Sequence, residues 1–377
     1  MRAQTNRRAK NSMNHSTVLF AIMSIIVDRP DRRRSAAPPN LQVNRHVIKS
    51  NPQRRRQSMR RLLANRLRAL NDSPLVRPET RAKVMTAVET VGYEPNLAAR
   101  ALAAGGSRAV GILLTTRLTH GMSTTFTALV GTLREHSRPF VLDTAIENDE
   151  ESLRAALARL RGYSVQATIL LAQRAKSVAI ASQQRHGDKL VSVIAGHPDS
   201  PESPIVAIDQ ALGARLATKH LIEQGYRNLL HVPGDLEWQD ASERLSSYIA
   251  VCKEVGIDPA WMPANSWGAE AGAAVAEELI AGHLPDAVLA GNDDIAIGMC
   301  HTFLTHGVRI PDDIGIVGFD DIPQARWMTP SLTTVVQDFE ALGRQAVEAA
   351  EALIAGEAPE SCQLSPTLAV RHSSRRH

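Results

Sequence analysis

The sequence is poor in cysteine, with three among 377 residues: Cys252, Cys300 and Cys362. They are far apart, odd in number and form no CxxC pair. A disulfide framework and a thiolate zinc site are therefore both unsupported. We expect a protein of the reducing cytoplasm that carries no structural metal.

Long apolar runs are also missing. The most membrane-like segment, Val18 to Val27, is too short to span a bilayer. It follows a basic stretch, as the core of an export signal does, but the charged segment 28–34 separates it from the small residues Ser35-Ala36-Ala37. We predict neither export nor contact with a membrane.

The common catalytic signatures are absent. The sequence has no GxSxG elbow, no HExxH, no GxxxxGK[ST] loop and no GxGxxG after its first predicted strand. His301 and His306 are five residues apart on a predicted helix, so they do not share a face on which to bind a metal. These absences argue against an enzyme, and no cofactor is indicated.

Charge is distributed unevenly along the chain. Residues 1–71 hold 17 Lys or Arg against the two acids Asp28 and Asp31, whereas acids exceed bases in the remainder. A basic arm on an acidic body predicts contact with a polyanion at the arm and not at the body. The alternative is an N-terminus that is unstructured or spurious.

The sequence pattern of the N-terminal third predicts an arm followed by a small helical module. Residues 1–57 lack apolar periodicity and are predicted to be disordered. Helical spacing appears over 57–70, and a better-marked helix begins at Pro78 and ends near Gly92. Asn96 is placed to cap a further short helix, which ends before a glycine-rich linker.

Beyond Arg108, apolar β-prone runs alternate with amphipathic helices, a pattern typical of parallel sheets covered on both faces. Its length predicts an α/β fold of two doubly wound parallel-sheet subdomains that face a cleft, with ligands bound beyond the carboxyl ends of the strands. The predicted strands are 109–114, 140–142, 168–171, 190–194, 229–232, 287–290 and 314–318, and the predicted helices between them include 150–160, 212–223, 241–255, 269–280 and 295–305.

Polar residues follow two of these strands. Asn292-Asp293-Asp294 comes after 287–290, and Asp320-Asp321 comes after 314–318. Carboxylates and an amide at such positions suit a hydroxyl-rich neutral or cationic ligand better than an anion. Helix capping by the Asn-Asp-Asp segment is the alternative.

Two further residues have both a binding and a structural interpretation. Arg244, in the first turns of a predicted helix, offers a planar fork of donors, but it also stands four residues from Asp240 and could pair with it. Trp267 precedes another helix and could stack on a sugar ring or a base, or simply fill the core.

Several motifs in order resemble the LacI/GalR (lactose repressor) family of bacterial transcription regulators, whose fold is that of type I periplasmic binding proteins preceded by a DNA-binding headpiece. The first two are LVRPETRAKV at 75–84 and VGYEPNLAARAL at 91–102, similar to that family's third helix and hinge helix. The later ones are AID at 207–209, HLIEQGY at 220–226, GNDDIAIG at 291–298, VGFDDIP at 317–323 and PSLTTV at 330–335, and the resemblance spans about 69–371.

The resemblance implies a homodimer, with a tetramer as the alternative, whose hinge helices enter the minor groove of operator DNA. Leu102 matches the apolar wedge between base pairs. The other DNA-binding residues are then Asn96, Ala99 and Arg100, and the effector-binding residues are Arg244, Trp267, Asn292 and Asp320, with Asp293 added for its place at a strand end.

The chain departs from the family upstream of Ala69. Residues 59–68 contain no hydroxyl-bearing residue and no Gly-Val turn, so the base-reading helix of the helix-turn-helix is missing. To explain this loss of resemblance, we favour a shifted reading frame or a misplaced start over a natural variant that binds DNA with an arginine-rich arm. The first sensor subdomain departs at 117–126 and at Ala195-Gly196-His197, which leaves the effector open.

The expected organisation is therefore a basic arm, a remnant headpiece, a hinge, a sensor and a tail. We predict a transcriptional repressor controlled by a small polar effector such as a sugar. The alternatives are a periplasmic-type sugar-binding protein, or an enzyme that uses Asp293, Asp294 or Asp320 as acid and base. The predicted boundaries are 1–57 for the arm, 58–94 for the headpiece, 95–108 for the hinge, 109–371 for the sensor and 372–377 for the tail.

Overall fold

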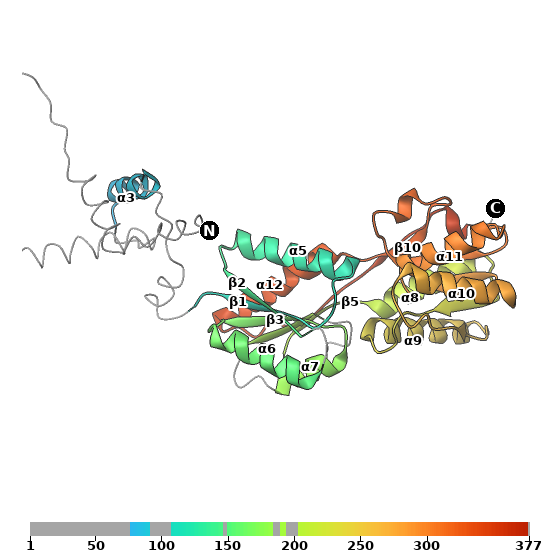
Figure 1. Ribbon diagram of the computed structural model, residues 1–377, viewed down its shortest axis with the longest axis horizontal. Coiled ribbons are helices and arrows are strands. Elements are labelled where there is room, and N and C mark those ends of the chain that lie inside the picture. The colour runs from blue at the N-terminus through green and yellow to red at the C-terminus, as the bar shows by residue number, and fades with distance from the viewer. Residues whose placement is uncertain (1–75, 91–106, 146–148, 184–188, 194–202, 376–377) are drawn as a thin grey trace, which may run out of the picture. The chain divides into compact units, whose positions relative to one another are not determined.

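The computed structural model describes residues 76–90, 107–145, 149–183, 189–193 and 203–375. The chain divides into two units, 1–100 and 101–377. Within the first unit, the described structure is helix α3 (Pro78–Thr90) (Figure 1). Its start at Pro78 confirms the predicted helix. Proline has no N–H to leave unpaired in the first turn, and its fixed φ angle suits that position.

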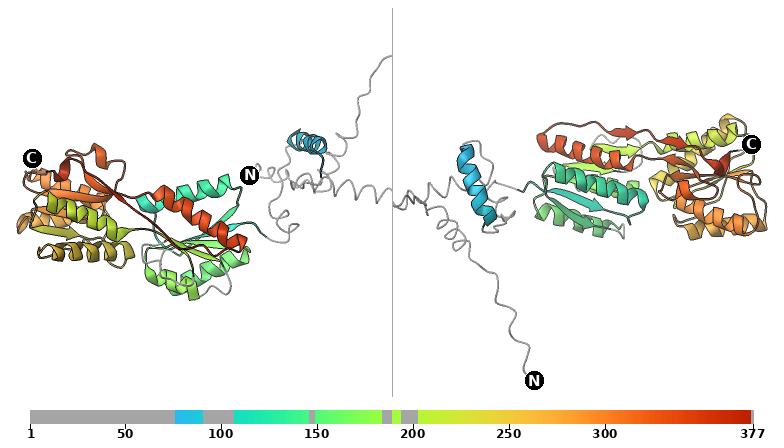
Figure 2. Two further views of the ribbon diagram at one scale, coloured as in Figure 1. Left: turned by 180° about the vertical axis from the view of Figure 1, so that it is seen from behind. Right: turned by 90° about the horizontal axis from the view of Figure 1, so that it is seen from above.

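The second unit begins with a six-stranded sheet of the order β11-β5-β4-β3-β1-β2, in which every neighbouring pair is parallel. Helices α5 and α12 pack together on one face, and α6 and α7 cover the other (Figures 1 and 2). We call this sheet and its helices the first subdomain. The strands are β1 (Val110–Leu114), β2 (Phe140–Thr144), β3 (Ala167–Leu171), β4 (Leu190–Val193), β5 (Ile205–Ile208) and β11 (Cys362–Leu364), and the helices are α5 (His120–Glu135), α6 (Glu150–Gly162), α7 (Ala175–Gln183) and α12 (Phe339–Ala355).

Continuous apolar strands follow from burial on both faces of this sheet. Ile112 and Ile169 point toward α5 and α12, whereas their neighbours Leu113 and Leu170 point toward α6 and α7. All four side chains are fully buried. Successive strand residues alternate between faces, so a strand covered on both sides needs an apolar residue at every position.

The second subdomain is a similar sheet of the order β12-β10-β9-β8-β6-β7. Its pairs are parallel except that β12 runs antiparallel to β10. Helices α8 and α9 cover one face, and α10 and α11 the other. The strands are β6 (Leu229–Val232), β7 (Ala260–Trp261), β8 (Ala287–Ala290), β9 (Gly315–Asp320), β10 (Thr333–Val336) and β12 (Thr367–Ala369), and the helices are α8 (Gln210–Glu223), α9 (Gln239–Glu254), α10 (Ala269–Ala281) and α11 (Asp293–Thr305).

Two glycines allow α10 and α11 to pack closely. A Cβ at Gly298 would meet the backbone carbonyl of Ala269, and one at Gly272 would meet that of Ile295. The backbones of the two helices therefore touch where only a hydrogen atom fits. This contact fixes α11, whose first turn follows the polar residues at the end of β8.

The chain crosses between the two subdomains three times. It leaves the first subdomain after β5, returns after β10 at Gln337, and crosses again between β11 and β12. Figure 2 shows α12 beside α5 although they are far apart in sequence. The prediction of two doubly wound subdomains is confirmed, with the antiparallel strand β12 as an addition.

The packed structure extends past the predicted end of the sensor at residue 371. A 3₁₀ turn, η2 (His372–Ser374), buries Ser373 and Ser374 completely. Ser373 donates a 2.6 Å hydrogen bond to the Ile316 carbonyl, and Ser374 lies 2.8 Å from a ring nitrogen of His220. These residues belong to the second subdomain rather than to a tail.

No helix among the described residues is long and apolar enough to cross a membrane. The segment 18–27, the arm 1–57, most of the predicted headpiece and residues 195–197 lie outside the described residues.

Candidate functional site

A small cavity of about 50 Å³ lies at the carboxyl ends of strands from both subdomains. Asp320 is the last residue of β9, Asn292 follows β8, and Gln173 follows β3. This is where ligands bind in doubly wound sheets. The cavity is lined by Thr119, Gly121, Met122, Ala172, Gln173, Val193, Val206, Ala207, Ile208, Phe339 and Leu342, largely from the first subdomain, and by Gln210, Trp238, Asp240, Arg244, Trp267, Asn292, Asp320 and Gln337, largely from the second or from a crossover.

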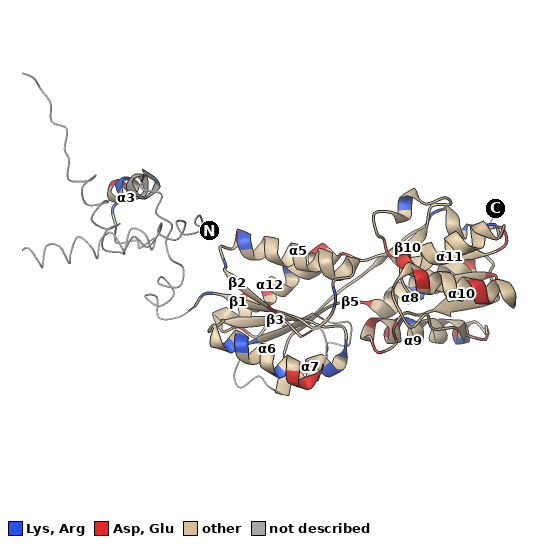
Figure 3. Ribbon diagram, in the orientation of Figure 1, with Lys and Arg blue, Asp and Glu red and all other residues tan. Residues whose placement is uncertain are grey.

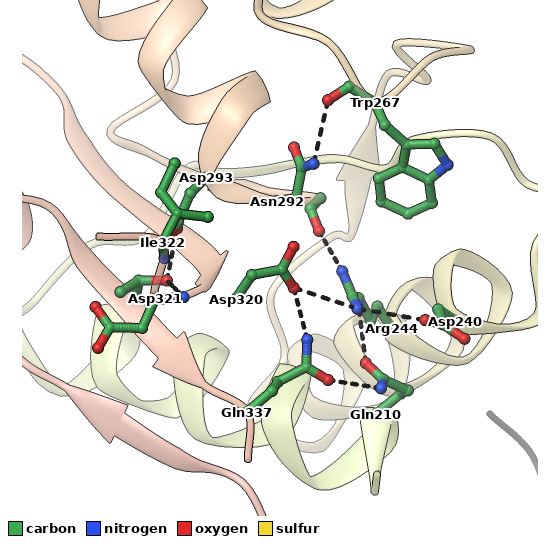
Figure 4. Close-up of polar contacts among 12 residues, drawn as sticks. Gln210, Asp240, Arg244, Trp267, Asn292, Asp293, Asp320, Asp321, Ile322 and Gln337 are labelled. Carbon is green, nitrogen blue, oxygen red and sulfur yellow. Dashed lines mark hydrogen bonds and ion pairs between the residues drawn. The ribbon is translucent and has the colours of Figure 1, made fainter. Parts of the chain in front are cut away.

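Arg244 lies at the centre of the polar wall. Its side chain is buried on α9 and its guanidinium lies 3.8 Å above the centroid of the Phe319 ring. Nε donates to Gln210 at 2.9 Å, and Nη1 donates to the Gly291 carbonyl at 2.5 Å. Nη2 is 3.8 Å from a carboxylate oxygen of Asp240 and equally far from one of Asp320 (Figure 4). Arg244 therefore lines the cavity and also lies beside Asp240, as the structural interpretation expects, while its role in binding an effector stays a prediction.

Asp320 closes β9 in an uncommon backbone conformation. Its φ angle is +109°, in the region that favours glycine and that costs of order 1–3 kcal/mol for other residues. Burial raises the pKa of its carboxyl to about 7, and Asp240 adds to this shift while Arg244 opposes it. Near neutral pH the group can therefore act as an acceptor or, when protonated, as a donor.

Besides their direct ion pair, Asp320 and Arg244 are connected by hydrogen bonds through two glutamines. Gln337 donates to Asp320 at 2.6 Å, and Gln210 donates to Gln337 at 2.8 Å while accepting from Arg244. We call Arg244, Gln210, Gln337 and Asp320 the polar ring (Figure 4). Because Gln210 follows the first crossover and Gln337 lies in the second, this ring connects the cavity to two of the strands that join the subdomains.

Asn292 serves as a helix cap and also lines the cavity. Its side-chain oxygen accepts from the backbone N–H of Ile295 at 2.9 Å, and its amide donates to the Trp267 carbonyl at 3.1 Å. The capping and binding alternatives are therefore compatible at this residue. Asn292, rather than either aspartate after it, caps α11.

The expectation that Asp293 faces the ligand needs correction. Its side chain is fully buried and does not line the cavity. It accepts hydrogen bonds from the Ile322 N–H at 2.9 Å and from the Thr334 hydroxyl at 2.6 Å, which tie α11 to the loop after β9 and to β10. Burial raises its pKa well above the ordinary value. The side chain points away from the cavity because the next residue in a helix is rotated by about 100°.

Trp267 lines the cavity together with Trp238, a residue that the sequence did not single out. Their ring centroids are 5.1 Å apart and the rings are tilted by 48°. A Cβ at Gly234 would strike the Trp267 indole, so glycine there admits the ring. Arg244 lies 5.7 Å from the Trp267 centroid. The two indoles form an aromatic wall beside the polar ring.

A clasp of five residues joins the subdomains at the edge of the cavity. Arg174, which follows β3, lies 3.0 Å from carboxylate oxygens of both Asp235 and Glu237 in the loop after β6. Beside it, the N–H of Gln239 donates to the carbonyl of Gln173 at 2.8 Å. We call these residues the mouth clasp.

The remaining predicted residues have different outcomes. Asp294 is half-buried and outside the lining, and Asp321 pairs with Arg371 at 2.7 Å. The proposed DNA-binding residues Asn96, Ala99, Arg100 and Leu102 lie outside the described residues. Among the residues that the structure describes, no group of three or more His, Cys, Asp or Glu is placed to hold a metal ion.

Comparisons with known proteins agree with this architecture. A model of the periplasmic binding protein-like domain matches residues 218–374. The fold resembles the lac repressor dimer bound to operator and the anti-inducer ONPF, with a TM-score of 0.77, 24% identity, and coverage of 83% of this chain and 95% of that one. It also resembles the transcriptional regulator CelR in complex with cellobiose, with a TM-score of 0.63, 25% identity, and coverage of 81% and 94%.

Sequence relatives identify the family. The chain is 31% identical over 319 residues to the HTH-type transcriptional regulator GalR of Salmonella typhimurium (strain SL1344), covering 81% of this chain and 90% of GalR. It is 26% identical over 310 residues to the HTH-type transcriptional repressor PurR of Escherichia coli O1:K1 / APEC, covering 81% and 91%. These relatives are regulators rather than enzymes, and the solute-binding alternative is not favoured. The chain therefore belongs to the LacI/GalR family of DNA-binding transcriptional regulators controlled by small-molecule effectors.

Proposed function

We propose that this protein represses transcription from an operator and that a small hydroxyl-rich effector in the cavity controls its affinity for DNA. The polar ring carries the proposal. It places donors and acceptors in one cavity and connects them to two crossovers between the subdomains. The CelR–cellobiose complex is a relative in fold whose ligand is a sugar.

The chemistry of the lining favours hydroxyl groups. Nη2 of Arg244 faces two carboxylates at 3.8 Å, beyond hydrogen-bond range, so a hydroxyl there could accept from the arginine and donate to a carboxylate. The indole of Trp267 offers a flat apolar surface to the C–H face of a sugar ring. A phosphate or carboxylate ligand would instead meet two acids.

The crossovers supply the route from effector to DNA. A ligand that replaces hydrogen bonds of Gln337 or Gln210 changes the contacts of residues at two crossovers. Such a ligand therefore biases the relative position of the two subdomains. In a homodimer this motion would change the spacing of the two hinge segments. Leu102 would be the apolar wedge, with Asn96, Ala99 and Arg100 beside it on the minor groove.

The proposal is tested by measuring effector and DNA binding on the same full-length protein. Calorimetry with a panel of sugars and nucleosides identifies a ligand, and DNA selected from a random pool by the purified protein supplies an operator. We expect Arg244→Lys and Asp320→Asn to weaken effector binding at least tenfold, because each loses part of the polar ring. We expect Leu102→Ala to weaken DNA binding and leave effector affinity unchanged.

Asp312→Asn, on an exposed surface away from the cavity, is the matched control for both measurements. Effector binding that is unaffected by Arg244→Lys and Asp320→Asn would remove the polar ring from the site. Selected DNA whose affinity does not change when the effector is added would contradict the regulatory part of the proposal.

A further inference from the structure

The ionisable groups around the cavity are unbalanced. Among the lining residues that the structure describes, Asp240, Arg244 and Asp320 are the ones with ionisable side chains, and their formal charges sum to one negative. The described part of the first subdomain contributes glutamine, threonine and apolar groups to the lining. A ligand that enters this cavity therefore meets two carboxylates and one guanidinium.

Arg244 forms an ion pair with Asp320 but no direct hydrogen bond to its carboxylate. Two of its nitrogens donate to Gln210 and to the Gly291 carbonyl. Only Nη2 faces the acids, at 3.8 Å from each, which is outside hydrogen-bond range. The Asp320 carboxylate accepts its 2.6 Å hydrogen bond from Gln337, a neutral donor. The largely buried Asp320 carboxylate thus has a neutral hydrogen-bond donor and a guanidinium beyond hydrogen-bond range, and a bound cation would lower the cost of keeping it charged.

The aromatic wall adds a second attraction for positive charge. Trp238 and Trp267 line the same cavity, and Asp240 follows Trp238 by two residues at the start of α9. A cation over the face of an indole, within about 6 Å of its centroid, is attracted by the negative face of the ring. Tryptophan faces combined with carboxylates are a typical environment for a bound amine.

The surroundings of the cavity continue this charge pattern. In the mouth clasp, Arg174 is shared by two acids, Asp235 and Glu237. Residues 72–377 contain 26 bases and 37 acids, and helix α10 carries Glu270, Glu277 and Glu278 and no Lys or Arg (Figure 3). An excess of one charge around a cleft raises the local concentration of ligands of the opposite charge.

We propose that the effector carries a protonated amino group, which binds at the carboxylates of Asp240 and Asp320 beside the indoles of Trp238 and Trp267. This inference rests on the proposed function and specifies the chemical class of its effector, an aminated polyol such as an amino sugar. Hydroxyls of the same ligand would use Arg244 and Asn292.

Calorimetry on the full-length protein tests this with matched ligand pairs. Amino sugars and open-chain amino polyols are compared with their hydroxyl parents and with their N-acetyl derivatives, which have similar shapes and no charge. We expect at least one amine to bind tenfold or more tightly than both of its neutral counterparts. We expect Asp240→Asn to reduce that preference to less than threefold, with the weaker neutral binding retained.

The pH dependence gives an independent measurement. Burial raises the pKa of Asp320 to about 7, and the charged groups that act on it are Arg244, Asp240, Asp293 and Asp294. An amine that remains protonated should bind about tenfold more weakly for each pH unit below that value, because Asp320 must first lose its proton. We expect Asp320→Asn to remove this dependence and Asp312→Asn to preserve it.

The outcomes separate this inference from the proposed function. Equal binding of amine and neutral counterparts, or a preference that persists in Asp240→Asn, would overturn the amine assignment and leave a sugar-like effector in the site. Binding of no compound in the panel would count against the proposed function as well.

Discussion

At the scale of single residues, the site depends on two aspartates with different structural roles. Asp320 faces the cavity and belongs to the polar ring, whereas Asp293 is buried behind it and ties α11 to β10. Burial raises the pKa of both carboxyls. An acid that keeps its proton longer in the folded chain than in the unfolded chain makes folding less favourable as the pH rises between its two pKa values.

For Asp320 this window runs from an unfolded value of 3.8 to a folded value of about 7. The free energy of unfolding of the parent, relative to Asp320→Asn, should therefore fall by up to about 1.4 kcal/mol per pH unit across the window and stay level above it. Urea denaturation at pH 5, 6, 7 and 8 measures the difference. Asp313→Asn is the control. Arg309 lowers the pKa of Asp313, so the contribution of Asp313 to the free energy of unfolding should not decline over this pH range. If the difference in unfolding free energy between the parent and Asp320→Asn stayed constant from pH 5 to 8, the raised pKa of Asp320 would be refuted.

At the scale of secondary-structure elements, glycine contacts set the position of the binding residues. Gly298 on α11 touches the backbone at the start of α10. Asn292 caps α11, and Trp267 lies just before α10. The packing of these two helices therefore determines where the amide and the indole stand in the cavity.

Gly298→Ala should separate the two helices, because its Cβ has no space. We expect a loss of stability of about 1–3 kcal/mol, typical of an overpacked core, together with weaker effector binding. Gly131→Ala on α5 is the matched control, since a Cβ there meets nothing within 4 Å, and it should stabilise the protein by up to about 1 kcal/mol. Thermal unfolding and calorimetry measure both effects. Gly298→Ala with parental stability would show that the contact is not tight.

The sequence was informative where the local pattern and the tertiary environment agree. Strands buried on both faces, such as β3 and β8, are continuous apolar runs and were predicted. Helix α5 was missed because its glycines and threonines weaken the helical pattern, and its packing on α12 stabilises it instead. Gln210 and Gln337 were missed because a glutamine at a strand end carries no motif. Their importance comes from two crossovers, which bring Gln210 Nε2 within 2.8 Å of Gln337 Oε1.

At the scale of the whole sensor, the mouth clasp holds the two subdomains together at the cavity edge. Arg174→Gln removes the only cation among its five residues and leaves Asp235 and Glu237 beside each other. Partly exposed ion pairs contribute up to about 1 kcal/mol, so we expect effector affinity to fall by up to about fivefold, and by less in 0.5 M salt.

Arg159→Gln provides the matched control for the clasp. Arg159 pairs with Asp143 at 2.7 Å, and both residues belong to the first subdomain. Its loss should leave effector affinity unchanged at every salt concentration. Calorimetry in low and high salt compares the two variants, and equal effects from both would show that the clasp does not contribute to closure.

The three crossovers also constrain how the protein is made. The first subdomain needs β11, which ends at Leu364, and the second needs β12 and the buried serines at 373 and 374. During synthesis neither half can complete its sheet until nearly all of the chain has left the ribosome. Nascent chains arrested after β10 should therefore expose unfinished apolar surfaces, which makes this sensor a natural client for chaperones that bind growing polypeptides.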